Sequence, residues 1–207
     1  MFKRIAIALS GAALLATSFN NFAYADDEMS PEIATALANL DASLPGTLIN
    51  NPYDIEWRTD GSDKRDSVVK SKDAPGGMAY RVTVKKKKKN HWDTAIRIPM
   101  TESIAKDDVI LMSFWARAEK PPKGRDAGDI TATIQRNIEP YDSVVEERLD
   151  IGTDWKLHSI SGKASRNYSA DKTNINFNLA HAKQTLEFGQ FYIMNLGKNA
   201  DASKYTK

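Results

Sequence analysis

The sequence predicts an all-β sandwich or barrel that follows a short helix and a secretory leader. After about residue 47, eight short segments alternate apolar and polar residues, and turns rich in Gly, Pro, Asp, Asn and Lys separate them. A hydrophobic content of 41% and a charged content of 27% are typical of a globular chain. The absence of Cys excludes a disulfide scaffold, a thiolate metal site and a cysteine nucleophile.

The first 25 residues have the three parts of a cleaved signal peptide. Lys3 and Arg4 form a positive segment, residues 5–19 are apolar, and residues 23–25 read Ala-Tyr-Ala, the small-x-small pattern of a cleavage site. Asn20 ends the apolar stretch before the roughly 20 residues that a membrane-spanning helix needs. We therefore expect an exported protein, periplasmic or extracellular, without a transmembrane segment.

Charge disfavours a nucleic-acid-binding protein. The chain has 29 basic and 27 acidic residues, and Lys3 and Arg4 of the leader account for the whole excess of +2. The one conspicuous cationic run is Lys85 to Lys89. Two interpretations of this run stay open: a solvated loop, or an attraction for an anionic partner such as an acidic polysaccharide, which salt would weaken.

A short helix is expected at the start of the mature chain. Ser30 is a suitable N-cap, Pro31 suits the first helical position, and residues 44–46 end the segment with Leu-Pro-Gly. The apolar residues that repeat at helical spacing are Ile33, Leu37 and Leu40. The expected organisation is a signal peptide over 1–25, a helical segment over 26–46, a β-sandwich over 47–197 and a polar tail over 198–207 that frays.

Period-two alternation predicts the strands of the sandwich in order. The expected strands are 78–84, 94–98, 109–118, 129–135, 144–149, 155–160, 174–179 and 185–194. Residues 119–128 are too rich in Pro and Gly to be anything but a loop. Trp57 and Trp155 flank strand starts and are expected to lie in the core, and His158 is expected to be a packed structural residue.

The alternation also predicts which side chains point away from the core. Across four strands this outward set carries Trp, Arg, Gln and Asn: Arg97, Trp115, Arg117, Gln135 and Asn178. Aromatic rings stack on the C–H faces of sugars, and planar amides and guanidinium groups match their hydroxyls. We therefore predict a carbohydrate site with Trp115 as its stacking platform and with Trp92 and Tyr141 at its rim. The alternative is an ordinary polar outer face, with Trp115 under a covering segment.

An ordered series of segments supports this interpretation. These segments lie at residues 51–57, 77–84, 91–96, 112–118, 134–141, 155–158 and 185–193. The series resembles the carbohydrate-binding modules of bacterial cellulases and xylanases, which have the galactose-binding-like jelly-roll fold, and it spans about 47–197. The resemblance implies a ligand lying across a concave sheet on the five outward residues. The family's last strand usually carries an acidic residue linked to a structural calcium ion, but this chain has Phe188, Gly189 and Gln190 there, so we expect no metal or cofactor.

The predicted function is non-catalytic binding of a polysaccharide or oligosaccharide with micromolar to millimolar affinity. No nucleophile elbow, phosphate-binding Gly loop or His-Glu-x-x-His motif occurs, and no pair of carboxylates stands out, so no catalytic residue is assigned. Two alternatives remain on the same scaffold: a small glycan hydrolase or lyase, and an envelope module that recognises another protein. The sequence assigns no particular glycan and no oligomeric state.

Overall fold

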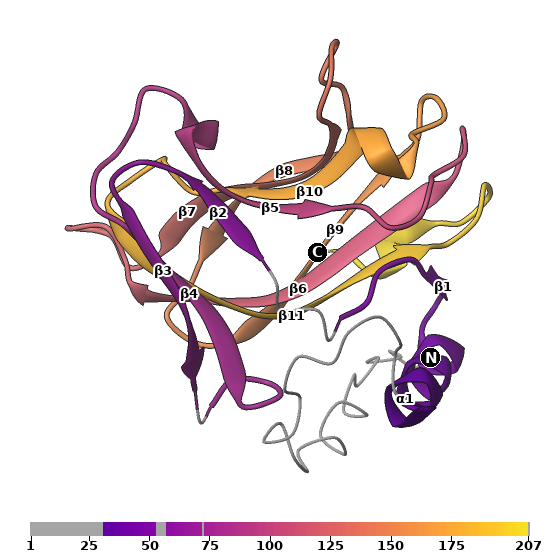
Figure 1. The fold of residues 1–207 in the computed structure, drawn as a ribbon, viewed down its shortest axis with the longest axis horizontal. Helices are drawn as coiled ribbons and strands as arrows, with labels where there is room; N and C mark the ends of the chain where they lie inside the picture. Colours follow the sequence, from indigo (N-terminus) through magenta and orange to yellow (C-terminus); the bar gives the residue numbers. More distant parts are fainter. Residues whose placement is uncertain (1–30, 53–56, 72, 207) are drawn as a thin grey trace, which may run out of the picture.

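Two antiparallel sheets make up the body of the protein. The computed structural model describes residues 31–52, 57–71 and 73–206, so the predicted signal peptide, the Ser30 cap and residues 53–56 lie outside the described residues. Figure 1 shows the sheets as two layers, with β5 and β10 in one and β6 and β11 in the other. The predicted all-β sandwich is confirmed.

Sheet A and sheet B are named here by their strands. Sheet A has the order β3 (Lys64–Lys70), β4 (Met78–Val84), β11 (Gln184–Asn195), β6 (Val109–Lys120) and β9 (Lys156–Lys163), and β1 (Thr47–Leu48) also pairs with β11. Sheet B has the order β2 (Arg58–Gly61), β5 (Thr94–Pro99), β10 (Thr173–Asn178), β7 (Gly128–Arg136) and β8 (Ser143–Ile151). The helical segments are α1 (Pro31–Ser43), η3 (His91–Asp93), η4 (Ala170–Lys172) and η5 (Ala202–Lys204).

Aromatic rings from both sheets meet in the core. The ring centroid of Phe177 on β10 lies 4.9 Å from that of Phe114 on β6 and 4.8 Å from that of Phe188 on β11. Trp57 packs on the same cluster, 5.4 Å from Tyr80, which confirms its expected place. Aliphatic residues of every central strand fill the remaining space, so the inward halves of the alternating patterns form one continuous core.

The outer face of sheet A is covered at one end. Leu40 and Leu44, from α1 and the turn after it, pack on a cluster of Leu111, Tyr192 and Met194, and Figure 1 shows α1 outside the layer that holds β6 and β11. The predicted helix is confirmed. The expectation of a frayed tail is wrong, because Tyr205 packs on the same apolar cluster. Within the described ranges, no helix is long and apolar enough to span a bilayer.

His158 is packed as expected and predicts an acid-sensitive stability. Its ring stacks on Phe114 with centroids 5.5 Å apart, and burial lowers its pKa to about 4. The unfolded chain binds this proton near pH 6.5. The contribution of the neutral, packed His158 ring to the free energy of unfolding is therefore complete above pH 6.5 and is lost as the pH falls towards 4. Because the ring retains some solvent contact, we expect a loss of about 2 kcal/mol.

Urea unfolding between pH 7 and 4 measures this loss, with His158→Leu as the comparison variant. Among the described residues, Nε2 of His158 has no hydrogen-bond partner, so the leucine sacrifices no polar contact. We expect the acid-dependent loss to be smaller in His158→Leu by that amount. Equal pH profiles in the two proteins would exclude His158 as the source.

Candidate functional site

The outer surface of sheet B carries polar and charged side chains aligned across its strands; we call it the polar face. Residues directly opposite one another in a sheet share a face, so the register defines the rows. One row runs through Arg58, Arg97, Asn176, Thr133 and Glu146, and the next runs through Asp60, Ala95, Asn178, Thr131 and Arg148. A third pairs Asn174 with Gln135. This face therefore gathers three of the predicted residues, Arg97, Gln135 and Asn178.

The side chains in the middle of the polar face, which we call its floor, are largely covered by their neighbours. Asn176 is 3% exposed and Asn178 is 4% exposed, although both point away from the core, while Glu146 on the neighbouring β8 is exposed. Asn176 donates from Nδ2 to Oγ1 of Thr133 at 3.0 Å. Within the described part of the chain, the Asn178 amide makes no side-chain hydrogen bond. Its planar donor and acceptor therefore have no protein partner among these residues, and a ligand that reaches the floor could bind them.

Arg97 is held in a fixed orientation at one side of that floor. Its Nε donates to Asp60 Oδ2 at 3.0 Å, its Nη1 donates to Asn176 Oδ1 at 3.4 Å, and its Nη2 donates to the Trp92 carbonyl at 3.3 Å. The guanidinium is therefore braced by β2, β10 and η3, and its side chain remains 36% exposed. A braced, planar and exposed guanidinium can contact a ligand with little further loss of entropy.

Aromatic rings flank the end of the polar face nearest Asn178. Trp92 is 51% exposed and contacts His91 edge-on, with ring centroids 4.7 Å apart. His91 stacks parallel to His181 at 4.8 Å, and His181 Nε2 lies 2.8 Å from the Thr131 hydroxyl. Burial lowers the pKa of both histidines, so the pair is neutral at pH 7. Both histidines were missed as site residues, because their pairing depends on two loops meeting at the same sheet end.

Tyr141 lies at the opposite end of the same face. Its side chain is 53% exposed, and its carbonyl accepts a hydrogen bond from Gln135 Nε2 at 2.5 Å. Gln135 opposes Asn174, whereas Asn178 lies four residues further along β10. At about 3.3 Å per residue, the two ends of the floor are about 13 Å apart. The structure thus places Trp92 and Tyr141 at opposite ends of one polar surface.

Arg148 forms the β8 side of the polar face and is anchored by Asp129. Its Nε and Nη2 donate to the two carboxylate oxygens of Asp129 at 2.8 and 2.7 Å. Arg125 adds a third contact at 3.0 Å. These hydrogen bonds, with that of Arg148 foremost, lower the pKa of Asp129 to about 2. The carboxylate therefore remains charged at physiological pH and keeps Arg148 in place.

The prediction that all five outward residues share one face is wrong. Trp115 and Arg117 belong to β6 in sheet A, whereas Arg97, Gln135 and Asn178 belong to sheet B. Trp115 is partly buried against the cluster of Leu111, Tyr192 and Met194 that α1 and Tyr205 cover. Alternation correctly gave the outward direction, but it does not tell which of two sheets a strand joins. Trp115 therefore cannot touch the same ligand patch as Asn178, and the site proposed below on sheet B does not include the predicted Trp115 platform.

Arg117 is occupied by a buried carboxylate. Glu187 on β11 is fully buried, accepts from Arg117 Nε at 2.6 Å and accepts from Arg81 Nε and Nη2 at 2.8 and 2.5 Å. The Arg117 guanidinium also lies over the Trp155 ring, 5.3 Å from its centroid. Trp155 is partly buried outside the main core cluster, contrary to expectation. This group of side chains is a structural clamp on sheet A rather than a free hydrogen-bonding surface.

Within the described part of the chain, the lysine run divides into members with and without an ion-pair partner. Lys86 lies 3.1 Å from Asp63, and Lys88 pairs with the same carboxylate. These contacts, that of Lys88 first, lower the pKa of Asp63 to about 2. Lys85, Lys87 and Lys89 are exposed. The run is therefore neither wholly solvated nor wholly available to a partner.

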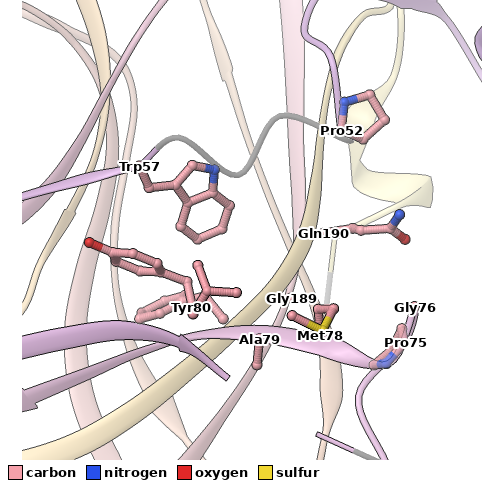
Figure 2. Close-up of a pocket in the computed structure, with 11 residues that line it drawn as sticks. Pro52, Trp57, Pro75, Gly76, Met78, Ala79, Tyr80, Gly189 and Gln190 are labelled. Atoms are coloured by element: carbon pink, nitrogen blue, oxygen red, sulfur yellow. The ribbon is translucent and has the colours of Figure 1, made fainter. Parts of the chain in front are cut away.

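A small apolar cavity lies beside Trp57. Figure 2 shows the indole above Tyr80 and Ala79, with Pro52 and Gln190 on the other side. Its volume is about 30 Å³, which matches one water molecule and is too small for a sugar ring. Phe188, Gly189 and Gln190 line it, and no Asp or Glu is among the lining residues. Across the described ranges, no three His, Asp or Glu side chains gather as metal ligands.

Comparison with solved structures identifies the fold. An arabinose-bound α-L-arabinofuranosidase matches with a TM-score of 0.53 and 12% identity over 72% of this chain, which corresponds to 24% of that enzyme. A carbohydrate-binding module of family 4 matches with a TM-score of 0.52 and 15% identity over 67% of this chain and 94% of its own length. The N-terminal cellulose-binding domain of Cellulomonas fimi β-1,4-glucanase C has a TM-score of 0.50 and 16% identity over 67% of this chain and 88% of that domain.

These likenesses confirm the predicted resemblance at the level of the fold. The chain has the jelly-roll architecture of carbohydrate-binding modules from cellulases and xylanases. No protein-family model matches the sequence, and comparison with curated protein sequences gives no match.

Proposed function

We propose that this protein binds polysaccharide chains non-catalytically on the polar face of sheet B. The observation that carries the proposal is the amide of Asn178, which makes no side-chain hydrogen bond to the described residues and lies beside the braced guanidinium of Arg97. Trp92 and Tyr141 expose aromatic rings at the two ends of that floor. This arrangement offers hydroxyl-binding groups in the centre and stacking surfaces at the ends of a surface about 13 Å long.

The fold supports the proposal without deciding it. Jelly rolls host several kinds of function, so the argument depends on the side chains of the site. The carboxylates nearest Arg97 and Arg148 are engaged in ion pairs, which suits binding better than acid–base catalysis. The leader pattern of residues 1–25 supports a location outside the cytoplasm, where plant-type or bacterial polysaccharides occur.

A glycan-array screen of the purified protein at low and physiological salt tests this function. We expect micromolar to millimolar binding to neutral β-linked glucans or xylans that survives the change in salt, because stacking and neutral hydrogen bonds are weakly screened. A folded protein that binds no neutral glycan at either salt concentration would contradict the proposal and favour a protein partner.

A further inference from the structure

A second, larger hollow lies on the outer side of sheet A. It has a volume of about 980 Å³ and is lined by β3, β4, the start of β11 and the loop that follows β6. We call it the basic groove, after six of its lining residues: Arg65, Arg81, Lys87, Lys120, Lys123 and Lys183. A single inorganic anion would fill little of it, since pockets of about 300–1,000 Å³ hold ligands as large as a drug or short oligomer.

Most of the positive charge in the basic groove is not compensated by ion pairs among the described residues. Arg81 is neutralised by Glu187, but no ion pair within the described residues engages the other five cations. Glu119 is the one acidic side chain among the lining residues, and it lies 3.9 Å from Arg81. Elsewhere in the protein, arginines such as Arg97, Arg125 and Arg148 are paired with carboxylates. Five unpaired cations around one concavity raise the local concentration of anions.

The cationic side chains come from different walls of the groove. Arg65 comes from β3, Lys120 and Lys123 from the end of β6 and its loop, and Lys183 from the turn before β11. Each of these four side chains is exposed. Charges spread along several walls suit an extended ligand with repeated negative groups better than a compact anion.

The uncharged lining indicates which polyanion fits. Pro121, Pro122 and Val69 offer apolar surface to C–H groups, and the paired hydroxyls of Thr83 and Thr185, 3.2 Å apart, offer hydrogen bonds. No Phe, Tyr or Trp is among the lining residues, so the groove lacks the large aromatic platforms on which single-stranded nucleic acids stack. We propose that the basic groove binds an acidic polysaccharide segment through its carboxylate or sulfate groups.

This site is independent of the proposed neutral-glycan site, because the groove lies on sheet A and the polar face on sheet B. The two sites meet at His181, which lines the groove and contacts Thr131. A protein with both sites binds neutral and acidic polysaccharides at the same time, as in a matrix that contains both. Failure of either site can be recognised separately, since their ligands and their residues differ.

The experiment measures binding of the full protein to oligogalacturonate and to dextran sulfate at low ionic strength, with dextran as the neutral comparison. The test variant is Lys120→Gln/Lys123→Gln/Lys183→Gln. The matched control, Lys106→Gln/Lys156→Gln/Lys172→Gln, makes the same change of net charge at exposed lysines outside the groove. We expect the groove variant to bind about tenfold more weakly, with a shallower dependence on salt, and the control to stay within about twofold.

Binding of one acidic glycan and not the other would identify carboxylate or sulfate as the recognised group and would support the proposal. Equal affinities in the groove variant and the control, or no binding of either acidic glycan, would overturn it. Tighter binding of single-stranded DNA that displaces the acidic glycans would also overturn it, in favour of a nucleic-acid partner. The variant Arg97→Ala/Asn178→Ala serves as a further check, since we expect its binding of acidic glycans to be unchanged.

Discussion

Replacing Arg97 and Asn178 together by alanine lowers the affinity for the glycan identified in the array by about 100-fold. The expected loss is large because a charged and a neutral hydrogen bond together contribute about 2–4 kcal/mol. The change is local: Asp60 keeps Arg58 as an ion-pair partner at 2.8 Å, and Asn178 makes no side-chain hydrogen bond in the described part of the protein. Isothermal titration calorimetry of wild type and variant measures the difference.

The control for this prediction is Trp115→Ala on the opposite sheet. Trp115 packs beside the cluster under α1, so its replacement affects stability but not the polar face. We expect unchanged affinity in a folded Trp115→Ala protein, with folding checked by circular dichroism and urea unfolding. Loss of binding in this variant, together with retained binding in Arg97→Ala/Asn178→Ala, would move the site to sheet A.

Replacing Glu187 by alanine lowers the free energy of unfolding by about 3 kcal/mol or more. The carboxylate is fully buried and accepts three short hydrogen bonds from Arg81 and Arg117. Its removal leaves Arg117 without an ion-pair partner among the described residues and leaves Arg81 with only Glu119, 3.9 Å away. Breaking a buried ion pair in this way costs about 3–5 kcal/mol. The arginines are partly exposed, so the lower end of this range applies. Guanidinium chloride unfolding measures the loss.

A surface ion pair provides the matched control. Lys163 lies 3.9 Å from Asp107, and both side chains are at least half exposed. We expect Lys163→Ala to change the free energy of unfolding by about 0.5 kcal/mol or less. If Glu187→Ala were as mild as Lys163→Ala, the clamp between β4, β6 and β11 would have no stabilising role.

Alternation predicted the strands whose two faces differ most. The segments 78–84 and 94–98 became β4 and β5 with almost unchanged bounds, because each sends one residue in two into the core. The prediction missed β2 and β3. The edge strand β3 has the sequence Lys-Arg-Asp-Ser-Val-Val-Lys and buries little, so its pairing with β4 leaves no apolar pattern.

The candidate site was only half predictable for a related reason. Outward direction follows from local sequence, and it correctly set Arg97, Gln135 and Asn178 apart from the core. Sheet membership depends on long-range pairing, which separated Trp115 from them. The stacking of His91 on His181 depends on the register of β5 with β10, so it could not be predicted from local sequence either.

The most direct test of the account is an NMR titration of the ¹⁵N-labelled protein with the bound oligosaccharide, following the backbone amides. We predict that the shifts concentrate on β5, β7 and β10, including residues 95, 131, 176 and 178, and on η3 around Trp92. Shifts concentrated on β6 and β11, around residues 115 and 117, would contradict the assignment of the glycan site to the polar face.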